Sequence, residues 1–205
     1  MPCPACTFLM HFRPVLVIPV LLVFLVSSPV AAAGPGAEEA WEAGKALWDE
    51  RRYDEALLLF ENATRLDPLF TDAWYYAGLT LARLERYEEA VAAYETLGTL
   101  DPASAVVWFN KGTNLVRLNR TDEARAAYEK AIELDPAYAF PWYNLGNLHA
   151  DAGKFREALE AYDTAIRIDP TFVPAWKGLA GMQAKLGKVT ESVHSFEIAR
   201  DLENS

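Results

Sequence analysis

The sequence predicts an all-α solenoid of about five helical hairpins, because several kinds of residue recur along it with one shared period. Asp-Pro pairs, tryptophans, glycines and alanines each return at steps of 34 residues. The four series are Asp67, Asp101, Asp135 and Asp169; Trp74, Trp108, Trp142 and Trp176; Gly44, Gly78, Gly112 and Gly146; and Ala56, Ala90, Ala124 and Ala158. An aromatic series keeps the same step, at Phe60, Tyr94, Tyr128, Tyr162 and Phe196. This shared period indicates a stack of similar units, each one a pair of helices.

Each unit has the pattern of two amphipathic helices. In residues 105–138, Trp108 and Leu115 fall on one face of a first helix, and Ala124 and Tyr128 fall on one face of a second. The repeated small residues let the two helices approach closely, and the repeated aromatic residue fills the space beside them. A single hairpin cannot bury its apolar face, so we expect neighbouring hairpins to stack. Ten helices and no strand are expected within residues 37–202.

One unit resembles the tetratricopeptide repeat consensus through Trp142-Tyr-Asn-Leu-Gly-Asn147, followed by Ala158, Tyr162, Ala165 and Pro170. The resemblance covers residues 37–205 and implies a right-handed α-solenoid. It divides this domain into repeats 37–70, 71–104, 105–138, 139–172 and 173–205. The first and last repeats depart from the pattern, with Ala40 in place of tryptophan and Ala180 in place of glycine. Such departures are expected of terminal repeats, because one of their faces meets solvent.

Residues 1–33 have the pattern of a secretory leader. Arg13 precedes a short apolar run, and small residues that match a cleavage site follow it. Cleavage would leave a mature chain that begins near Gly34. The uncharged stretch 14–33 also has the length of a membrane anchor, which needs about 20 residues, so both interpretations stay open. Either one places the repeats outside the cytoplasm, secreted or anchored, after a short linker at 34–36.

Composition and motifs favour a binding protein over an enzyme. The net charge of −10 argues against a nucleic-acid partner, because an acidic surface repels phosphate. The two cysteines, Cys3 and Cys6, lie in the leader, so a disulfide framework is excluded. Lipidation of these cysteines is an alternative if the leader is retained. No phosphate-binding loop, nucleophile motif or metal-ligand spacing occurs, and we interpret His149 and His194 as packing or solvated residues. We therefore expect no catalytic residue, metal or cofactor.

The family resemblance implies that ligand contacts come from the first helix of each repeat. The implied residues are Tyr75, Leu79 and Arg83; Phe109, Asn110, Thr113 and Arg117; Phe140, Tyr143, Asn144, Asn147 and Asp151; and Lys177 and Lys185. Tyr75, Phe109 and Tyr143 form an aromatic stripe, in which each residue directly follows a repeated tryptophan. Adjacent helical residues point about 100° apart, so the stripe and the tryptophans cannot face one core. We therefore predict that the stripe lines a ligand groove; the alternative is a core position.

Two polar residues of this set suggest how a peptide would be held. Asn110 and Asn144 resemble asparagines that bind the backbone of an extended peptide in some relatives, since an amide both donates and accepts hydrogen bonds. The alternative is that they are consensus residues without a ligand. The family's lysine- and asparagine-based carboxylate clamp is not implied, because Phe109, Thr113 and Gly178 stand where clamp residues would be.

The leading functional prediction is a non-catalytic, extracytoplasmic scaffold or assembly module that binds an extended protein or peptide in a concave groove. The alternative is a structural protein that self-associates through the uncapped end of the fifth repeat. There we expect Val193, Phe196 and Leu202 to be partly exposed. Two sequons, at Asn62 and Asn119, are candidate N-glycosylation sites.

Overall fold

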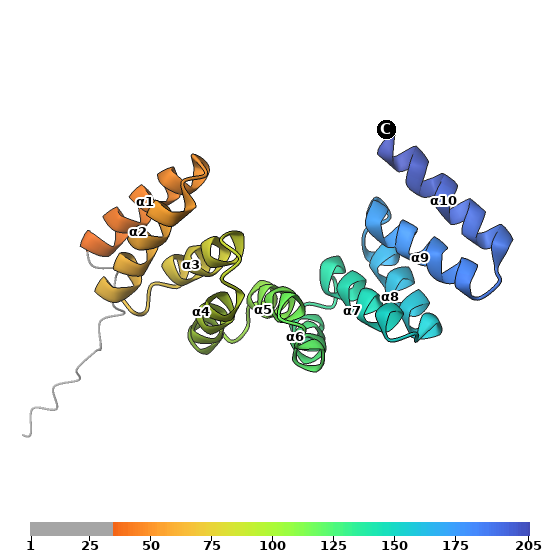
Figure 1. Cartoon of the computed structure of the whole chain (residues 1–205), viewed down its shortest axis with the longest axis horizontal. Coiled ribbons are helices and arrows are strands. Elements are labelled where there is room, and N and C mark those ends of the chain that lie inside the picture. The colour runs from red at the N-terminus through yellow and green to blue at the C-terminus, as the bar shows by residue number, and fades with distance from the viewer. Residues whose placement is uncertain (1–34) are drawn as a thin grey trace, which may run out of the picture. The chain divides into compact units, whose positions relative to one another are not determined.

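A computed structural model describes residues 35–205, which form ten α-helices and no strand (Figure 1). The helices are α1 (Pro35–Asp49), α2 (Tyr53–Leu66), α3 (Thr71–Arg83), α4 (Tyr87–Leu100), α5 (Ala105–Arg117), α6 (Thr121–Leu134), α7 (Ala139–Asp151), α8 (Phe155–Ile168), α9 (Val173–Lys185) and α10 (Val189–Glu203). The prediction of an all-α repeat fold is confirmed. The predicted leader, and the cysteines within it, lie outside the described residues. None of the ten helices has the length and apolar character needed to cross a membrane.

The start of α1 differs from the expected linker at 34–36. Pro35 and Gly36 already belong to the helix. A proline suits the first turn of a helix, because its missing N–H would have no partner inside the helix there and its φ is already close to the helical value. The sequence pattern does not show this extension, because these two residues lie outside the 34-residue repeat.

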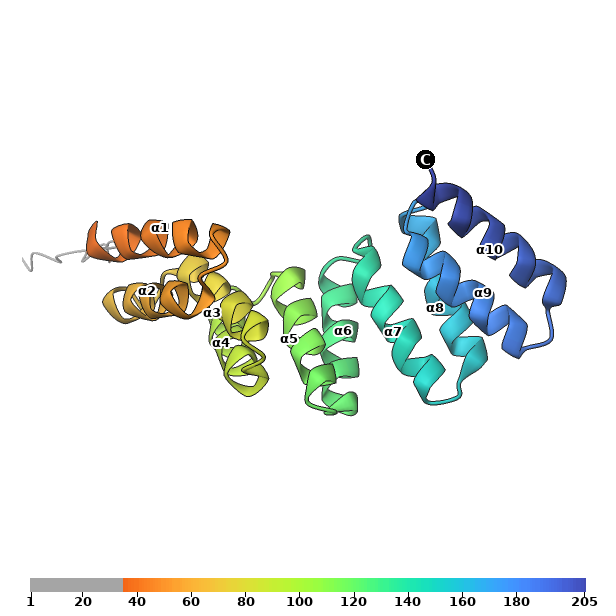
Figure 2. The same ribbon diagram turned by 45° about the horizontal axis from the view of Figure 1, so that its top comes forward.

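The helices pair as antiparallel hairpins, and each hairpin stacks on the next (Figure 2). Each odd-numbered helix packs against the even-numbered helix that follows it, and each even-numbered helix packs against the first helix of the next hairpin. The core lies between these layers. Its largest fully buried side chains include Phe60, Tyr94 and Tyr128 from the aromatic series. The repeated glycine admits these rings: a Cβ atom on Gly112 would lie 2.7 Å from the Tyr128 ring.

The turn inside each hairpin is built on a left-handed residue. These residues are Arg51, Glu85, Asn119, Gly153 and Gly187, with φ between 58° and 77°. In the third hairpin, the N–H of Arg120 donates to the carbonyl of Leu115 over 2.9 Å, which satisfies a free carbonyl at the helix end. This turn reverses the chain within three residues, so the two helices of a hairpin lie side by side.

The turn between hairpins is built on the Asp-Pro pair. The Oδ1 atom of Asp135 accepts a hydrogen bond from the N–H of Ala137 over 3.0 Å, and Asp67 and Asp169 make the equivalent bond. The indole Nε1 of Trp142 donates to the carbonyl of Pro136 over 3.2 Å, which ties the turn to the following helix. Trp74 and Trp176 repeat this bond. The first, third and fourth of the four turns therefore share one hydrogen-bonding pattern.

Candidate peptide-binding surface

The aromatic stripe lies on the first helices of three successive hairpins. Tyr75 is on α3, Phe109 on α5 and Tyr143 on α7, and all three are half-buried. Each ring packs against the core aromatic residue of its own hairpin. The ring centroids are 6.4 Å apart for Tyr75–Tyr94, 6.0 Å for Phe109–Tyr128 and 5.8 Å for Tyr143–Tyr162.

This packing differs from the expectation that the stripe stands apart from the core. A stripe residue lies three positions before the repeated glycine, and residues three apart share one face of a helix. The core ring rests on that glycine, so the stripe ring covers its edge. The stripe is therefore both a surface and the outer layer of the core. Replacing Phe109 by alanine is therefore expected to lower the stability of the fold as well as to remove an aromatic ring from the surface.

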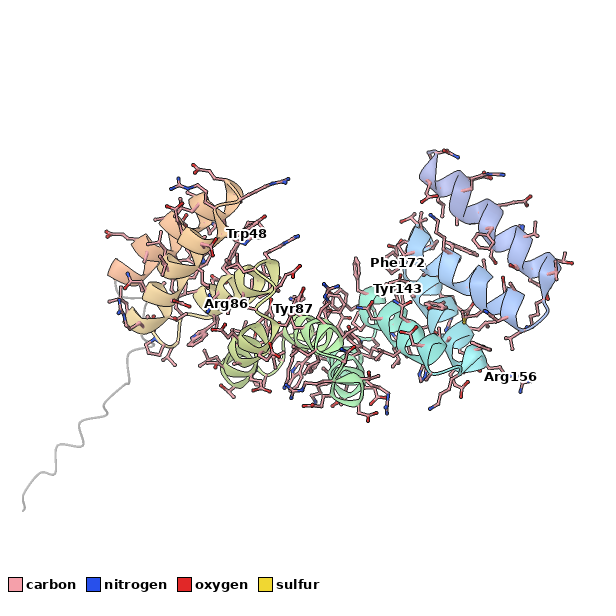
Figure 3. The ribbon with its side chains drawn as sticks, in the orientation of Figure 1. Trp48, Arg86, Tyr87, Tyr143, Arg156 and Phe172 are labelled. Atoms are coloured by element: carbon pink, nitrogen blue, oxygen red, sulfur yellow. The ribbon has the colours of Figure 1, made fainter. Side chains whose placement is uncertain are left out.

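A second aromatic series, which the sequence analysis did not identify, extends the stripe. Its members directly precede the first helix of a repeat, at Phe70, Tyr138 and Phe172. Tyr143 and Phe172 lie edge to face with centroids 5.2 Å apart, and Figure 3 shows them together. Phe109 and Tyr138 have the same separation, 5.2 Å. The signal was available in the sequence, because these residues are spaced by multiples of 34 and stand two positions after Pro68, Pro136 and Pro170.

Phe140 joins these pairs into one continuous surface. Its ring centroid lies 5.9 Å from that of Phe109 and 4.9 Å from that of Phe172. Its side chain is 48% exposed. We call Phe109, Tyr138, Phe140, Tyr143 and Phe172 the aromatic surface; it runs across α5, α7 and the start of α9.

The predicted asparagines differ in how they are bonded. Asn144 donates through Nδ2 to the Tyr128 hydroxyl over 3.3 Å. The Tyr162 hydroxyl donates to Oδ1 of Asn147 over 2.7 Å. The amide of Asn110 is half-buried and forms no hydrogen bond with any other residue in 35–205. Only Asn110 among the three therefore presents an amide whose donors and acceptor are all unused by the described chain.

Two core tyrosines are held neutral beside these amides. Burial raises the pKa of Tyr162 to about 12, and it also raises the pKa of Tyr128. A tyrosine hydroxyl is already protonated at neutral pH, and the raised pKa extends this range to higher pH. The Tyr128 hydroxyl also lies 3.4 Å from the hydroxyl of Thr113, whose Oγ1 in turn donates to the carbonyl of Phe109 over 3.0 Å. Thr113 is exposed, so this chain of bonds reaches the surface.

The predicted arginines lie at the ends of their helices. Arg117 donates to the Tyr87 hydroxyl from Nη2 over 2.9 Å and from Nε over 3.2 Å, and its guanidinium carbon lies 5.2 Å from the Tyr87 ring centroid. Tyr87 begins α4, so this contact joins the second and third hairpins. Arg83 is exposed at the end of α3 and lines a surface cavity with Trp48 and Tyr53. Each cation lies eight residues after the stripe residue of its own helix, and its neighbours are Trp48 and Tyr53 for Arg83 and Tyr87 for Arg117.

The comparison with known families rests on the same repeats. A model of the tetratricopeptide repeat matches residues 42–105, 109–172 and 143–202, which together cover most of the chain. The chain belongs to the tetratricopeptide repeat family. No curated protein sequence matches it.

Solved structures of tetratricopeptide repeat proteins share this fold. MamA from Desulfovibrio magneticus RS-1 is 22% identical, with a TM-score of 0.76, over 84% of this chain and 98% of that one. PilW, described as a type IV pilus biogenesis factor, is 24% identical with a TM-score of 0.72, over 84% of this chain and 80% of its own. YrrB, described as having an unusual peptide-binding site, is 21% identical with a TM-score of 0.65, over 85% of this chain and 95% of its own. At these identities the likeness concerns the fold alone.

The remaining predicted sites fall on the surface of the tetratricopeptide repeats. Asn119 is exposed at the tip of the third hairpin, whereas Asn62 lies within α2 and its Oδ1 accepts a bond from Arg65 over 2.6 Å. Within residues 35–205 no group of three His, Cys, Asp or Glu side chains is placed to hold a metal ion. The aromatic surface and Asn110 are thus the features of this domain that most resemble a recognition site.

Proposed function

We propose that this protein is a non-catalytic scaffold outside the cytoplasm, whose first-helix surface binds an extended segment of a partner polypeptide. The observation that carries the proposal is the aromatic surface, a continuous array of rings that includes the 48% exposed Phe140. Aromatic residues are over-represented among residues that dominate binding energy at protein interfaces. The unused amide of Asn110, on the same helix as Phe109, supplies a donor and an acceptor for a peptide group.

Two further observations support the proposal. The related fold of YrrB carries a peptide-binding site, according to its description. The leader-like pattern of residues 1–33 supports the location outside the cytoplasm. N-terminal sequencing of the chain recovered outside the cytoplasm tests this part, and a chain found only in the cytoplasm with an intact N-terminus would refute it.

The binding surface is tested with a captured partner. The immobilised protein is incubated with extracts of its native organism, captured proteins are identified by mass spectrometry, and a synthetic segment of the partner is titrated against the protein. Phe140→Ala is expected to weaken binding by about tenfold, since truncating an interface aromatic commonly costs more than about 1–2 kcal/mol. Asn110→Ala is expected to weaken it without changing the unfolding temperature.

The matched control is Leu58→Ala, which truncates a side chain 66% exposed on the second helix of a hairpin. It should leave affinity unchanged. If Phe140→Ala and Leu58→Ala bind the segment equally well, the aromatic surface is not the binding site.

A second candidate function, self-association, is favoured by the exposed apolar face of α10. Val189 is 66% exposed, Val193 53% and Phe196 49%. In the earlier hairpins, the corresponding face of the second helix packs against the next repeat. Sedimentation velocity over a range of protein concentrations tests this candidate. A mass that stays monomeric, or that Phe196→Glu does not change, would refute it.

A further inference from the structure

The third repeat lacks the aromatic residue that precedes the first helix in its neighbours. Phe70, Tyr138 and Phe172 occupy this place in the second, fourth and fifth repeats, but Ser104 occupies it in the third. Tyr138 and Phe172 each pack on the stripe residue of the preceding repeat, with ring centroids 5.2 Å apart. Phe70 packs in the same way on Trp41, which takes the place of the stripe residue in the first repeat, with centroids 5.5 Å apart. Tyr75 is the stripe residue that faces Ser104, and so it has no such ring.

A cavity of about 130 Å³ lies where that ring would be. Its apolar lining comes from Tyr75, Leu97 and Val107, and its polar lining includes Asp72, Asp101 and Ser104. We call it the Ser104 notch. For comparison, an apolar protein cavity of about 150 Å³ holds a benzene molecule. The notch therefore has the size of one aromatic ring.

The hydrogen bonds of the 101–104 turn are also incomplete. Asp67, Asp135 and Asp169 each accept a bond from the N–H two residues later, whereas the Asp101 carboxylate accepts none from the part of the chain that the structure describes. The N–H of Ser104 lies 3.5 Å from the Asp101 carbonyl, at the limit of a hydrogen bond. These differences leave an unused acceptor, the Asp101 carboxylate, at the wall of the notch.

The tryptophan of the third repeat, Trp108, also differs from its equivalents in its hydrogen bonding. The Nε1 atom of Trp108 is buried and has no hydrogen-bond partner within residues 35–205, although its equivalents in three other repeats donate to a proline carbonyl. An unsatisfied buried donor costs about 1–3 kcal/mol. The 101–104 turn therefore lacks two of the contacts that fix the other three turns.

We propose that the Ser104 notch receives an aromatic side chain, a tyrosine, from the polypeptide bound to the first-helix surface; this rests on the proposed function. The protein's own repeats show which group fits, because the same place holds Phe70, Tyr138 or Phe172 elsewhere. The ring stacks on Tyr75 between Leu97 and Val107. The tyrosine hydroxyl donates to the Asp101 carboxylate, which is otherwise unbonded.

A positively charged side chain is the competing occupant, because two carboxylates line the notch. The helix termini oppose it: α3 begins at Thr71 and α5 at Ala105, so the positive ends of two helix dipoles lie at the notch. A neutral ring with one donor avoids this repulsion and still uses Asp101. The experiment below distinguishes the two occupants.

The probe is a randomised pool of synthetic twelve-residue peptides, captured by the immobilised protein and sequenced. We expect one position of the captured peptides to be enriched in tyrosine, then phenylalanine. In a selected peptide, replacing this tyrosine by alanine or arginine should weaken binding at least about tenfold. Ser104→Phe, which fills the notch from within, should weaken binding of the tyrosine peptide by a similar factor.

The matched control is Ala103→Phe, which adds the same ring to the same turn one residue earlier. Its equivalent in the second repeat, Leu69, is 59% exposed, so this ring should project into solvent and leave binding unchanged. Thermal unfolding checks both variants. Ser104→Phe should unfold at the same or a higher temperature, because the sister repeats accommodate a ring there.

The outcomes separate the two proposals. Capture of no peptide by the wild-type protein refutes the proposed function. Three outcomes refute the notch alone. They are capture without aromatic enrichment, equal affinity of the tyrosine and arginine peptides, and an equal loss of binding in Ser104→Phe and Ala103→Phe. The peptide-side substitution needs no protein variant, so a folding defect in Ser104→Phe leaves the test decisive.

Discussion

Two glycines of α9 should respond oppositely to the same substitution. A Cβ atom on Gly178 would lie 2.7 Å from Cζ and 2.8 Å from Cε1 of Tyr162, whereas one on Gly181 would meet nothing within 4 Å. Tyr162 cannot easily move away, because its hydroxyl is bonded to Asn147 over 2.7 Å and the position of a Cβ on Gly146 is also 2.7 Å from its ring. Gly178→Ala therefore forces overpacking, and Gly181→Ala does not.

The magnitudes follow from two opposing effects. Replacing glycine by alanine inside a helix stabilises it by about 0.5–1 kcal/mol. Overpacking a well-filled core costs about 1–3 kcal/mol. We expect Gly181→Ala to raise the free energy of unfolding by about 0.5–1 kcal/mol. Gly178→Ala should lower it by up to about 2 kcal/mol, so the two variants should differ by about 1–3 kcal/mol.

Urea unfolding followed by far-ultraviolet circular dichroism measures both variants. The expected difference corresponds to at least about 2–4 °C in unfolding temperature, since 1 kcal/mol shifts a domain of this size by that amount. A third variant, Gly178→Ala with Tyr162→Leu, tests the cause: the penalty should shrink when the ring is absent. If Gly178→Ala stabilises the protein as much as Gly181→Ala, the close approach of Tyr162 to α9 is wrong.

Three further predictions concern buried or bonded groups. Burial raises the pKa of Tyr162 to about 12. Between about pH 10 and 12 the unfolded state therefore binds fewer protons than the folded state, and the free energy of unfolding should fall as pH rises. Tyr162→Phe should reduce this dependence on pH in unfolding curves recorded across that range. Trp142→Phe should cost about 0.5–1.5 kcal/mol more than Trp108→Phe in urea unfolding, because only Trp142 donates an indole hydrogen bond; equal costs would contradict this. Asp135→Ala should lower the unfolding temperature through loss of its turn bond, whereas Asp101→Ala should not, and calorimetry of the two variants compares them.

The repeat itself was predictable because its physics is local. The 34-residue step, the glycine against the aromatic residue, and the Asp-Pro turn each involve residues of one hairpin or its immediate boundary. The position of Phe109 was predicted less well. Helical geometry places it about 100° from Trp108, but whether its outer edge meets water or Tyr138 depends on how the next hairpin stacks. The angle between successive hairpins is set by packing between repeats, which the consensus positions do not specify.

The bonding state of the asparagines could not be inferred for a similar reason. Asn110 and Asn144 occupy equivalent positions, yet only Asn144 reaches a tyrosine hydroxyl, that of Tyr128. Tyr94, the equivalent of Tyr128, keeps its hydroxyl buried without a partner, and burial raises its pKa. A difference in ring placement of this kind changes which amide remains available to a ligand. It is invisible in a sequence where both asparagines match the consensus.

Structural repetition gives this protein its own internal control for function. Four turns join the five hairpins, and three of them share the aspartate bond, the indole bond and the preceding aromatic residue. The third repeat lacks all three features at once, at Asp101, Ser104 and Trp108. Natural sequences are expected to be locally consistent, and exceptions concentrate at functional sites. A single tyrosine at residue 104 would restore the pattern of the fourth repeat, so a serine beside Tyr75 is what a binding site predicts and what stability alone does not.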